Sequence, residues 1–270
     1  MQSARYSLVC MSHTDVFDPG FWARAHGALF DLDGVITPTA VVHERAWASL
    51  FNWFLSEHGA NASDRSEFTL SDYHTYVDGK PRYDGVRSFL ASRDITLPEG
   101  DPSDEPGPDT VCALGNRKNS EFNAIIAEEG IDPYPGSDAL LDAFDSLGIL
   151  QGIVSSSKNA RPVLAGAGYE GRFDVIVDGV VSAELDLPGK PAPDAFLLGA
   201  EQLGVDPSHT VVFEDAVSGV AAGAAGGFML VVGVNRGSGA QVLLENGADV
   251  VVDDLGELVQ AALAAADRKT

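Results

Sequence analysis

The chain has 270 residues, of which 40 are Asp or Glu and 17 are Lys or Arg, so its formal net charge is −23. This length allows one large domain, or a core domain with a smaller one, and a hydrophobic content of 45% excludes a fully disordered chain. The acidic excess argues against nucleic acid or an anionic membrane as a partner.

The cysteines and the apolar segments bear on the cellular compartment. There are two cysteines, Cys10 and Cys112, without metal-ligand spacing, so we expect no disulfide framework. The first 20 residues lack the hydrophobic region of a signal peptide, and no apolar run approaches the ~20 residues that span a bilayer. We expect a cytoplasmic protein without a membrane partner, either a monomer or a weak homo-oligomer.

Short apolar runs predict six buried strands, at residues 28–32, 152–155, 175–177, 211–213, 229–232 and 249–252. From about residue 150 onward they alternate with helical patterns, which together with an earlier one cover residues 137–147, 160–167, 193–203, 218–225 and 240–246. This alternation predicts an α/β fold: a doubly wound, Rossmann-like parallel sheet with helices on both faces.

The stretch after the first strand has a different pattern. No second strand follows for more than a hundred residues, and apolar residues at helical spacing predict helices at 43–58, 85–92 and 118–129, with a proline-rich loop at 97–110. We therefore predict a mostly helical cap domain, residues 41–131, inserted into a core of residues 27–40 and 132–270. Residues 1–26 are expected to form an N-terminal extension.

Two carboxylates, Asp31 and Asp33, follow the first strand. Ligands of open parallel sheets bind at the carboxyl ends of the strands, and side chains at i and i+2 of an extended segment point to the same side. One carboxylate suits a nucleophile and the other a proton donor, and their mutual repulsion invites Mg²⁺. Gly34 permits a sharp turn directly afterwards.

Three later segments at strand ends carry complementary chemistry. Small polar residues at 155–159 offer hydroxyl and backbone N–H groups for a phosphate. Lys190, set between Gly189 and Pro191, could neutralise charge on a transferring phosphoryl group, and Glu214 with Asp215 offer hard oxygen ligands for Mg²⁺. Together with the first pair, they form the set needed for phosphoryl transfer through an aspartyl phosphate.

These motifs resemble the haloacid dehalogenase superfamily, and more closely its β-phosphoglucomutase-type branch, over about residues 28–258. The matching segments are Phe30-Asp31-Leu32-Asp33-Gly34-Val35-Ile36-Thr37, residues 155–159, residues 189–194 and residues 213–220. The resemblance implies a phosphosugar mutase that interconverts β-D-glucose 1-phosphate and β-D-glucose 6-phosphate through an aspartyl phosphate and a bisphosphate activator.

The resemblance also implies roles for the core residues. Asp31 would carry the phosphoryl group, and Asp33 would act as acid and base. Mg²⁺ would be held by Asp31, the backbone carbonyl of Asp33 and Asp215, with Glu214 in or near its coordination shell. The transferring phosphoryl group would be held by Ser155 and Lys190, and the residues Ser156 and Asn159 would bind substrate.

The inserted domain narrows the resemblance, because residues 73–82 and 115–119 are similar to cap segments of the mutase branch. A mutase must hold two phosphates, and a bidentate arginine suits the second one. The resemblance implies that Arg82 and Lys118 bind the distal phosphate. The other substrate-binding residues that it implies in this part of the chain are Thr39, His43, Trp47 and Gly79.

One departure leaves alternatives open. The family usually has Asp before the threonine that follows the turn, whereas this chain has Pro38, which fixes φ and lacks an N–H group. The balance between mutase and hydrolase activity is therefore open, and a Mg-dependent sugar-phosphate phosphatase would share every core residue. A non-enzymatic phospho-acceptor switch is a remote alternative, because such domains lack the helical insertion.

Overall fold

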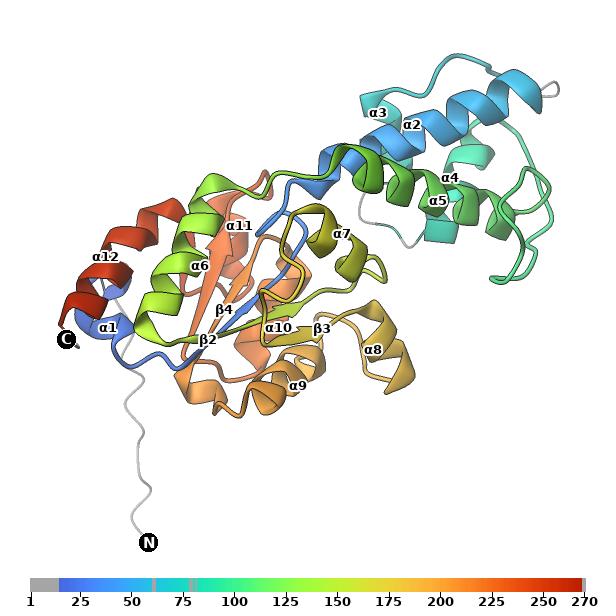
Figure 1. Ribbon diagram of the computed structural model, residues 1–270. Coiled ribbons are helices and arrows are strands. Elements are labelled where there is room, and N and C mark those ends of the chain that lie inside the picture. Colours follow the sequence, from blue (N-terminus) through green and yellow to red (C-terminus); the bar gives the residue numbers. More distant parts are fainter. Residues whose placement is uncertain (1–14, 60–61, 78–79, 81, 269–270) are drawn as a thin grey trace, which may run out of the picture. The chain divides into compact units, whose positions relative to one another are not determined.

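A computed structural model describes residues 15–59, 62–77, 80 and 82–268 (Figure 1). The described chain divides into two compact units. The core unit comprises the residues up to Pro38 and from Asp132 onward, and the cap unit runs from Thr39 to Ile131. The first boundary between the two units lies between Pro38 and Thr39, whereas the sequence predicted it between residues 40 and 41. The difference arises because the first helix of the cap begins at Thr39.

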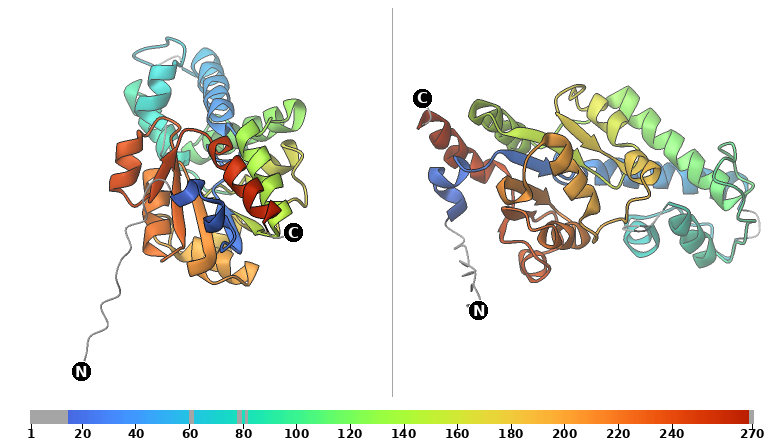
Figure 2. Two further views of the ribbon diagram at one scale, coloured as in Figure 1. Left: turned by 90° about the vertical axis from the view of Figure 1, so that its left-hand side faces the viewer. Right: turned by 90° about the horizontal axis from the view of Figure 1, so that it is seen from below.

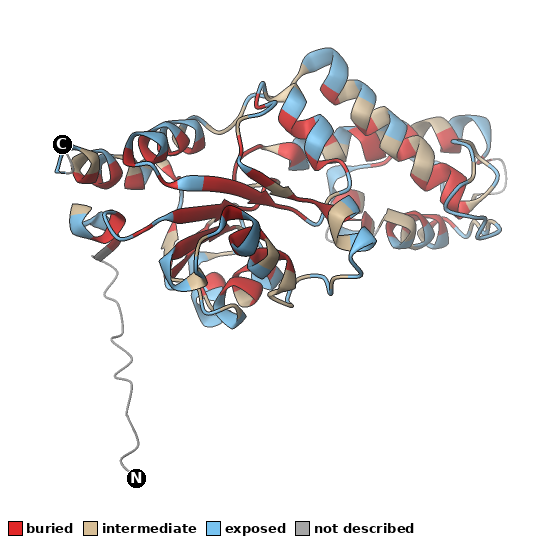
Figure 3. Cartoon of the chain, turned by 60° about the horizontal axis from the view of Figure 1, so that its bottom comes forward, coloured by how far each residue is buried: buried red, intermediate tan, exposed pale blue. Residues whose placement is uncertain are grey.

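The core unit is built on a six-stranded parallel sheet with the strand order β3-β2-β1-β4-β5-β6. The strands are β1 (Gly27–Phe30), β2 (Leu150–Val154), β3 (Val175–Val177), β4 (Thr210–Glu214), β5 (Leu230–Val234) and β6 (Val250–Val252). Most strand residues are buried, as Figure 3 shows, which explains their continuous apolar runs. The predicted α/β fold with a doubly wound parallel sheet is confirmed.

Helices cover both faces of the sheet, because successive strand residues point to opposite sides. On one face, Phe144 of α6 (Pro135–Leu147) lies against Phe30 and Phe213, whose rings stack 4.6 Å apart. On the other face, Leu29 and Val212 pack with residues of α9 (Asp194–Leu203), α10 (Val217–Ala225) and α11 (Ala240–Glu245). The two remaining helices near the sheet are α7 (Ala160–Gly166) and α8 (Gly179–Glu184).

The ends of the chain contribute to the core more than the sequence indicated. Residues 15–26 were expected to be an extension, but the indole of Trp22 in α1 (Pro19–Trp22) is fully buried 5.1 Å from the Phe144 ring. Burial of this large side chain makes the segment part of the core unit, which corrects the expectation. The alanine-rich tail forms α12 (Gly256–Asp267), and this helix packs along α6 (Figures 1 and 2).

The cap unit is helical. Its elements are α2 (Thr39–Glu57), α3 (Leu70–Asp72), a π-helical turn η2 (Tyr73–Val77), α4 (Arg82–Ser92) and α5 (Val111–Glu129). The predicted helices overlap α2, α4 and α5, but each begins later than the observed helix, and the first runs one residue past the end of α2. α5 follows the N-cap Thr110, whose hydroxyl accepts a hydrogen bond from the Ala113 N–H. The cap unit has a hydrophobic core of its own, in which the rings of Phe51 and Phe89 lie 3.9 Å apart.

Candidate active site

The segment after β1 forms a tight turn that presents two carboxylates. The Asp31 N–H donates to the Phe213 carbonyl of β4, and the Gly34 N–H donates to the Thr37 carbonyl at 2.8 Å. Gly34 has a φ of +85°, and a Cβ there would overlap the carboxylate of Asp215. Glycine is therefore required twice, for the turn and for the approach of Asp215 to the residues that follow β1.

Lys190 connects the ends of three adjacent strands. Its ammonium group lies 2.6 Å from Oδ1 of Asp31 and 2.6 Å from Oε1 of Glu214, and donates to the Val154 carbonyl at 3.1 Å. Only 8% of its side chain is exposed, and 1% of that of Glu214. Burial disfavours the charge on Lys190, but attraction to Asp31 and Glu214 outweighs it, so the pKa of the lysine is raised and the ammonium stays charged.

The carboxylates around this lysine outnumber it. Burial, then repulsion by Glu214 and Asp33, raises the pKa of Asp215 to about 7. The pKa of Asp31 is also raised, chiefly by burial, with Lys190 opposing and the neighbouring carboxylates adding to the rise. Asp31, Asp33, Glu214 and Asp215 lie close enough to repel one another, and Lys190 contacts Asp31 and Glu214. This excess of negative charge favours a divalent cation, whose coordination would include ligands besides these side chains.

Glu214 occupies a position different from that of a simple metal ligand. Its Oε1 accepts from Lys190, and its Oε2 accepts from the Ala216 N–H at 2.9 Å. Over the described ranges 15–59, 62–77, 80 and 82–268, no three Asp, Glu, His or Cys side chains are grouped so that they could hold a metal by themselves. The two Glu214 oxygens are thus engaged by Lys190 and by the Ala216 N–H, while its predicted place in or near a metal coordination shell stays a prediction.

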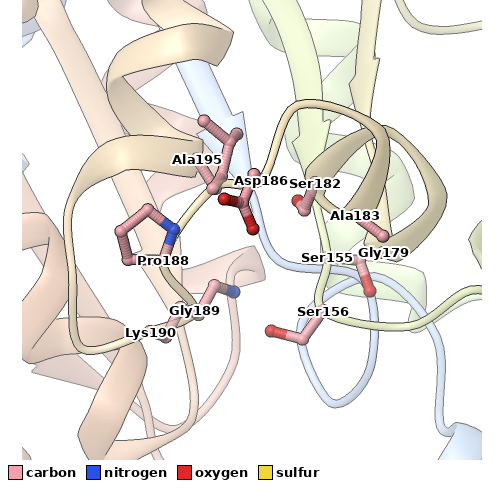
Figure 4. A pocket seen from close by; sticks show the side chains of 11 residues that line it. Ser155, Ser156, Gly179, Ser182, Ala183, Asp186, Pro188, Gly189, Lys190 and Ala195 are labelled. Atoms are coloured by element: carbon pink, nitrogen blue, oxygen red, sulfur yellow. The ribbon is translucent and has the colours of Figure 1, made fainter.

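The predicted phosphate clamp lies at the end of β2. Ser155, which is buried, accepts a hydrogen bond from the Ser157 N–H, and the Ser157 hydroxyl accepts one from the Asn159 N–H, both at 3.1 Å. Figure 4 shows Ser155, Ser156 and Lys190 around one cavity of about 240 Å³. The structure thus brings three of the predicted residues together, with Asn159 at the start of α7.

In the cap unit, Lys118 and His43 form a buried pair. The lysine is 4% exposed, and its Nζ lies 2.6 Å from Nδ1 of His43, whose ring stacks on Phe122 at 4.3 Å. Burial, then repulsion by Lys118 and Arg82, lowers the pKa of His43 to about 3. The histidine is therefore neutral near pH 7, and its unprotonated Nδ1 accepts from the lysine.

Arg82 lies at the start of α4 and is oriented by neutral side chains. Its Nη2 donates to Oδ1 of Asn119 at 2.8 Å, and the neighbouring Tyr83 hydroxyl donates to Asn116 at 2.9 Å. A Cβ at Gly115 would lie 2.6 Å from the Tyr83 ring, so glycine lets α4 and α5 approach. Burial lowers the pKa of Arg82. Arg82 and Lys118 are both partly desolvated cations, and they contact the neutral side chains of Asn119 and His43. Such a pair of cations favours an anionic ligand.

The remaining predicted cap residues fall in different places. Trp47 is 5% exposed and stacks on Phe51 at 5.2 Å, and the Lys118 ammonium lies 5.3 Å from its ring. In the cap unit, this side chain therefore packs in the hydrophobic core beside Lys118 and has little surface exposed for a ligand. Thr39 is fully buried as the first residue of α2, directly after Pro38. Gly79 lies outside the described residues.

Sequence reasoning did not single out several residues that hold these groups. Asn119 accepts a hydrogen bond from Arg82, and Tyr83 also interacts with its side chain. Both residues are adjacent in sequence to predicted site residues, and this adjacency was the available signal. Arg236 follows β5 and donates to the Gly34 carbonyl. Its position at a strand end, like that of Asp31 and Asp215, was the signal that could have identified it.

Comparison with known proteins identifies the class. The pattern of haloacid dehalogenase-like hydrolases matches residues 26–227, which is most of the chain, so the chain belongs to the haloacid dehalogenase superfamily. The β-phosphoglucomutase of Mycobacterium tuberculosis is 48% identical over 245 residues, which cover 89% of this chain and 94% of that protein. Within the superfamily, the chain therefore falls in the β-phosphoglucomutase branch, as the motifs predicted.

Two further similar proteins are a phosphatase and a mutase. Hexitol phosphatase A of Escherichia coli is 33% identical over 239 residues, covering 87% of this chain and 94% of that protein. The crystal structure of a β-phosphoglucomutase from Clostridium difficile has a TM-score of 0.64 at 26% identity, over 91% of this chain and 98% of that chain. Mutases and phosphatases are thus both similar to this chain, and all are enzymes.

Proposed function

We propose that this protein is a β-phosphoglucomutase that interconverts β-D-glucose 1-phosphate and β-D-glucose 6-phosphate. The observation that carries the proposal is a pair of complementary clusters: carboxylates around Lys190 in the core unit, and the cations Arg82 and Lys118 with neutral partners in the cap unit. A mutase needs a phosphoryl-transfer centre and a second phosphate site. The 48% identity to a mycobacterial β-phosphoglucomutase supports this choice.

In the proposed reaction, Asp31 exchanges a phosphoryl group with the sugar. When Asp31 carries the group, the 6-hydroxyl of glucose 1-phosphate attacks phosphorus, loses its proton to Asp33 and becomes the bisphosphate. After the bisphosphate reorients, Asp31 attacks the 1-phosphate and Asp33 returns the proton to the leaving O1, which releases glucose 6-phosphate. The Lys190 ammonium, 2.6 Å from Asp31, stabilises the charge on the transferring group.

Mg²⁺ is the proposed cofactor, and membership of this family implies a metal in general. We assign the site to Asp31, Asp215 and the backbone carbonyl of Asp33, with Glu214 beside them. When bound, the ion offsets the carboxylate repulsion and shields the phosphoryl oxygens. Ser155 and Asn159, with the exposed Ser156, are proposed to hold the phosphoryl oxygens at the end of β2.

In the cap, Arg82 and Lys118 are proposed to bind the distal phosphate. Asn119 accepts from the guanidinium of Arg82, and neutral His43 accepts from Lys118, so these two partners orient the cations without adding negative charge. Exclusion of water from the aspartyl phosphate would then distinguish a mutase from a hydrolase. Pro38, directly before α2, makes the backbone there stiffer than the Asp usual in the family.

The test follows two products at once. The pure protein is incubated with β-glucose 1-phosphate, Mg²⁺ and a trace of β-glucose 1,6-bisphosphate, and both glucose 6-phosphate and free phosphate are measured. We expect glucose 6-phosphate to account for nearly all substrate loss. Release of free phosphate at the rate of substrate loss would instead establish the second candidate function, a sugar-phosphate phosphatase. The 33% identity to hexitol phosphatase A supports this alternative.

The remaining proposals concern partners and location. A phosphosugar and its bisphosphate are the proposed small-molecule partners, and the protein is proposed to act as a monomer or weak homo-oligomer. In the part of the chain that the structure describes, no helix has both the length and the hydropathy to cross a bilayer. The buried Cys112 thiol is free, which supports a cytoplasmic location, where thiols stay reduced.

A further inference from the structure

Arg236, on the segment after β5, reaches across the carboxyl edge of the sheet to the turn that carries Asp31 and Asp33. Its Nε donates to the Gly34 carbonyl at 2.9 Å, and its Nη1 donates to the Asp253 carbonyl at 3.0 Å. The same guanidinium lies 3.7 Å from the centre of the Tyr134 ring. One side chain thus joins four segments that are far apart in the sequence.

The environment of Arg236 indicates a rigid anchor rather than a surface charge. Its side chain is 19% exposed, and its Nη2 lies 3.5 Å from Oδ2 of Asp254. Asp254 is itself fixed, because its other oxygen accepts from the Gly256 N–H at 2.8 Å and a Cβ at Gly136 would overlap it. A guanidinium that is stacked and has three oxygen partners retains little rotamer freedom.

The atom that Arg236 binds lies one residue from the proposed proton donor. Gly34 has a left-handed φ, and a Cβ at this position would overlap the Asp215 carboxylate. The Gly34 carbonyl belongs to the Gly34–Val35 peptide unit, which Arg236 holds, and the Gly34 N–H belongs to the preceding unit, which its hydrogen bond to the Thr37 carbonyl holds at 2.8 Å. With the peptide units on both sides of Gly34 held, the direction of the Asp33 carbonyl is restrained. Another hydrogen bond from the same segment, from the Ser238 hydroxyl to the Asp215 backbone carbonyl at 3.2 Å, holds the backbone of Asp215.

Arg236 also stabilises the place where the chain leaves the core unit. Tyr134, on which the guanidinium stacks, donates its N–H to the Ile36 carbonyl at 2.9 Å. The Ser137 hydroxyl donates to the Val35 carbonyl at 2.6 Å in a fully buried bond. The turn is therefore fastened from both sides, by Arg236 at Gly34 and by the start of α6 at residues 35 and 36.

We propose that Arg236 is a positioning residue for the catalytic turn: by binding the Gly34 carbonyl, it fixes the far side of the turn that begins at Asp33 and thereby supports the metal-binding and proton-transfer geometry of Asp31, Asp33 and Asp215. It does not contact the reacting atoms. The inference rests on the proposed aspartyl-phosphate chemistry but not on the identity of the sugar. Removing a group that orients metal ligands typically costs about 10- to 100-fold in metal affinity or activity.

The experiment compares Arg236→Gln with Arg172→Gln. Arg172 is a matched control because its side chain is 22% exposed and pairs with Asp145 at 2.8 Å, in the core unit but away from the turn. For each protein, Mg²⁺ affinity is measured by isothermal titration, kcat with β-glucose 1-phosphate and with a small aryl phosphate is determined, and the unfolding temperature is recorded.

For Arg236→Gln we expect Mg²⁺ affinity and both kcat values to fall by about 10-fold or more, with an unfolding temperature similar to that of Arg172→Gln. Guanidinium, added at a non-denaturing concentration to Arg236→Ala, should restore part of the kcat. Equal Mg²⁺ affinity and kcat in the two glutamine variants would overturn the proposal. If Arg236→Gln does not fold, Arg236→Lys decides: unchanged Mg²⁺ affinity overturns the proposal, and a 10-fold loss supports it.

The two proposals fail in different ways. If the wild-type protein releases phosphate instead of glucose 6-phosphate, the mutase proposal is wrong, while the Mg²⁺ titration and the aryl phosphate rate still test Arg236. If the wild type is a mutase and Arg236→Gln binds Mg²⁺ as tightly as Arg172→Gln does, only the positioning role is wrong.

Discussion

The site in the core unit and the cluster in the cap unit have opposite charge imbalances. Around Lys190, several buried carboxylates share one ammonium group, and the pKa of Asp215 is raised to about 7, first by burial and then by its carboxylate neighbours. Around His43, burial and the cations Lys118 and Arg82 lower the pKa of the histidine to about 3. Each imbalance is costly without a ligand of the opposite sign, which we propose to be a metal ion in the core and a phosphate in the cap.

The two clusters are also supported differently. In the core, a charged group binds other charged groups, as Lys190 does with Asp31 and Glu214. In the cap, cations are held by an amide and a neutral imidazole, on Asn119 and His43. Loss of a core group should therefore disturb chemistry and folding together, whereas loss of a cap cation should weaken substrate binding with smaller effects on folding.

The largest effect is expected for the nucleophile. Asp31→Asn should reduce both mutase activity and aryl phosphate hydrolysis by about 10⁴-fold or more, because an amide cannot carry the phosphoryl group. Acid-quenched protein incubated with labelled bisphosphate should lose its covalent label in parallel. Asp142→Asn, at an exposed carboxylate on α6, is the control and should keep both activities. Substantial turnover by Asp31→Asn would rule out the covalent route.

Removing the core lysine should be the most damaging change for folding. Lys190→Met leaves Asp31 and Glu214 buried without their common partner, and breaking a buried ion pair in this way costs about 3–5 kcal/mol in the free energy of unfolding. Urea unfolding measures this loss. Mg²⁺ should raise the unfolding temperature of this variant more than that of the wild type, because the carboxylate excess is larger. An equal Mg²⁺ response would contradict the assignment of the metal site to Asp31, Asp215 and the Asp33 carbonyl.

The core site was predictable from the sequence because its geometry depends on one simple rule. Parallel strands end at a common edge, so residues directly after β1 and β4, such as Asp31 and Asp215, must meet once the strands are recognised. What could not be predicted is how the charges pair: that Glu214 binds Lys190 and the Ala216 N–H depends on side-chain packing that no spacing rule contains.

The cap and the ends of the chain were harder to predict for a different reason. Helical spacing indicated α2, α4 and α5 but not which faces meet, so Asn119 and Tyr83 as supports of Arg82 were not foreseen. The short segment around Trp22 has too few residues to show a period, and its burial against Phe144 is a tertiary effect. Arg236 was missed because no carboxylate or hydroxyl motif accompanies it.

A cap cation should affect one activity selectively. Arg82→Gln should lower kcat/KM for β-glucose 1-phosphate by about 10- to 100-fold, the value of one or two charge-assisted hydrogen bonds, and leave aryl phosphate hydrolysis within about 3-fold. Arg45→Gln is the matched control, since Arg45 forms an exposed ion pair with Glu129 in the same unit. Equal losses on both substrates would show that Arg82 does not bind a distal phosphate.

The smallest effect concerns the pH dependence of cap stability. His43 has a pKa of about 3 in the folded protein, because of burial and then Lys118 and Arg82, against an ordinary value of 6.5. Between these values the unfolded chain binds a proton that the folded chain does not, so this histidine destabilises the fold as pH falls below 6.5. At pH 7 the penalty is absent, and at pH 5 it amounts to about 2 kcal/mol.

His43→Gln removes the titrating group and keeps a side chain that can accept a hydrogen bond from Lys118. Relative to the wild type, the variant should therefore gain about 2 kcal/mol in the free energy of unfolding when the pH changes from 7 to 5, measured by urea unfolding at both values. Gln241→Asn, at an exposed side chain of the core unit that does not titrate, should show no such gain. If the wild type and His43→Gln lose stability equally from pH 7 to pH 5, His43 titrates normally, and the cap does not hold the excess of positive charge that a second phosphate requires.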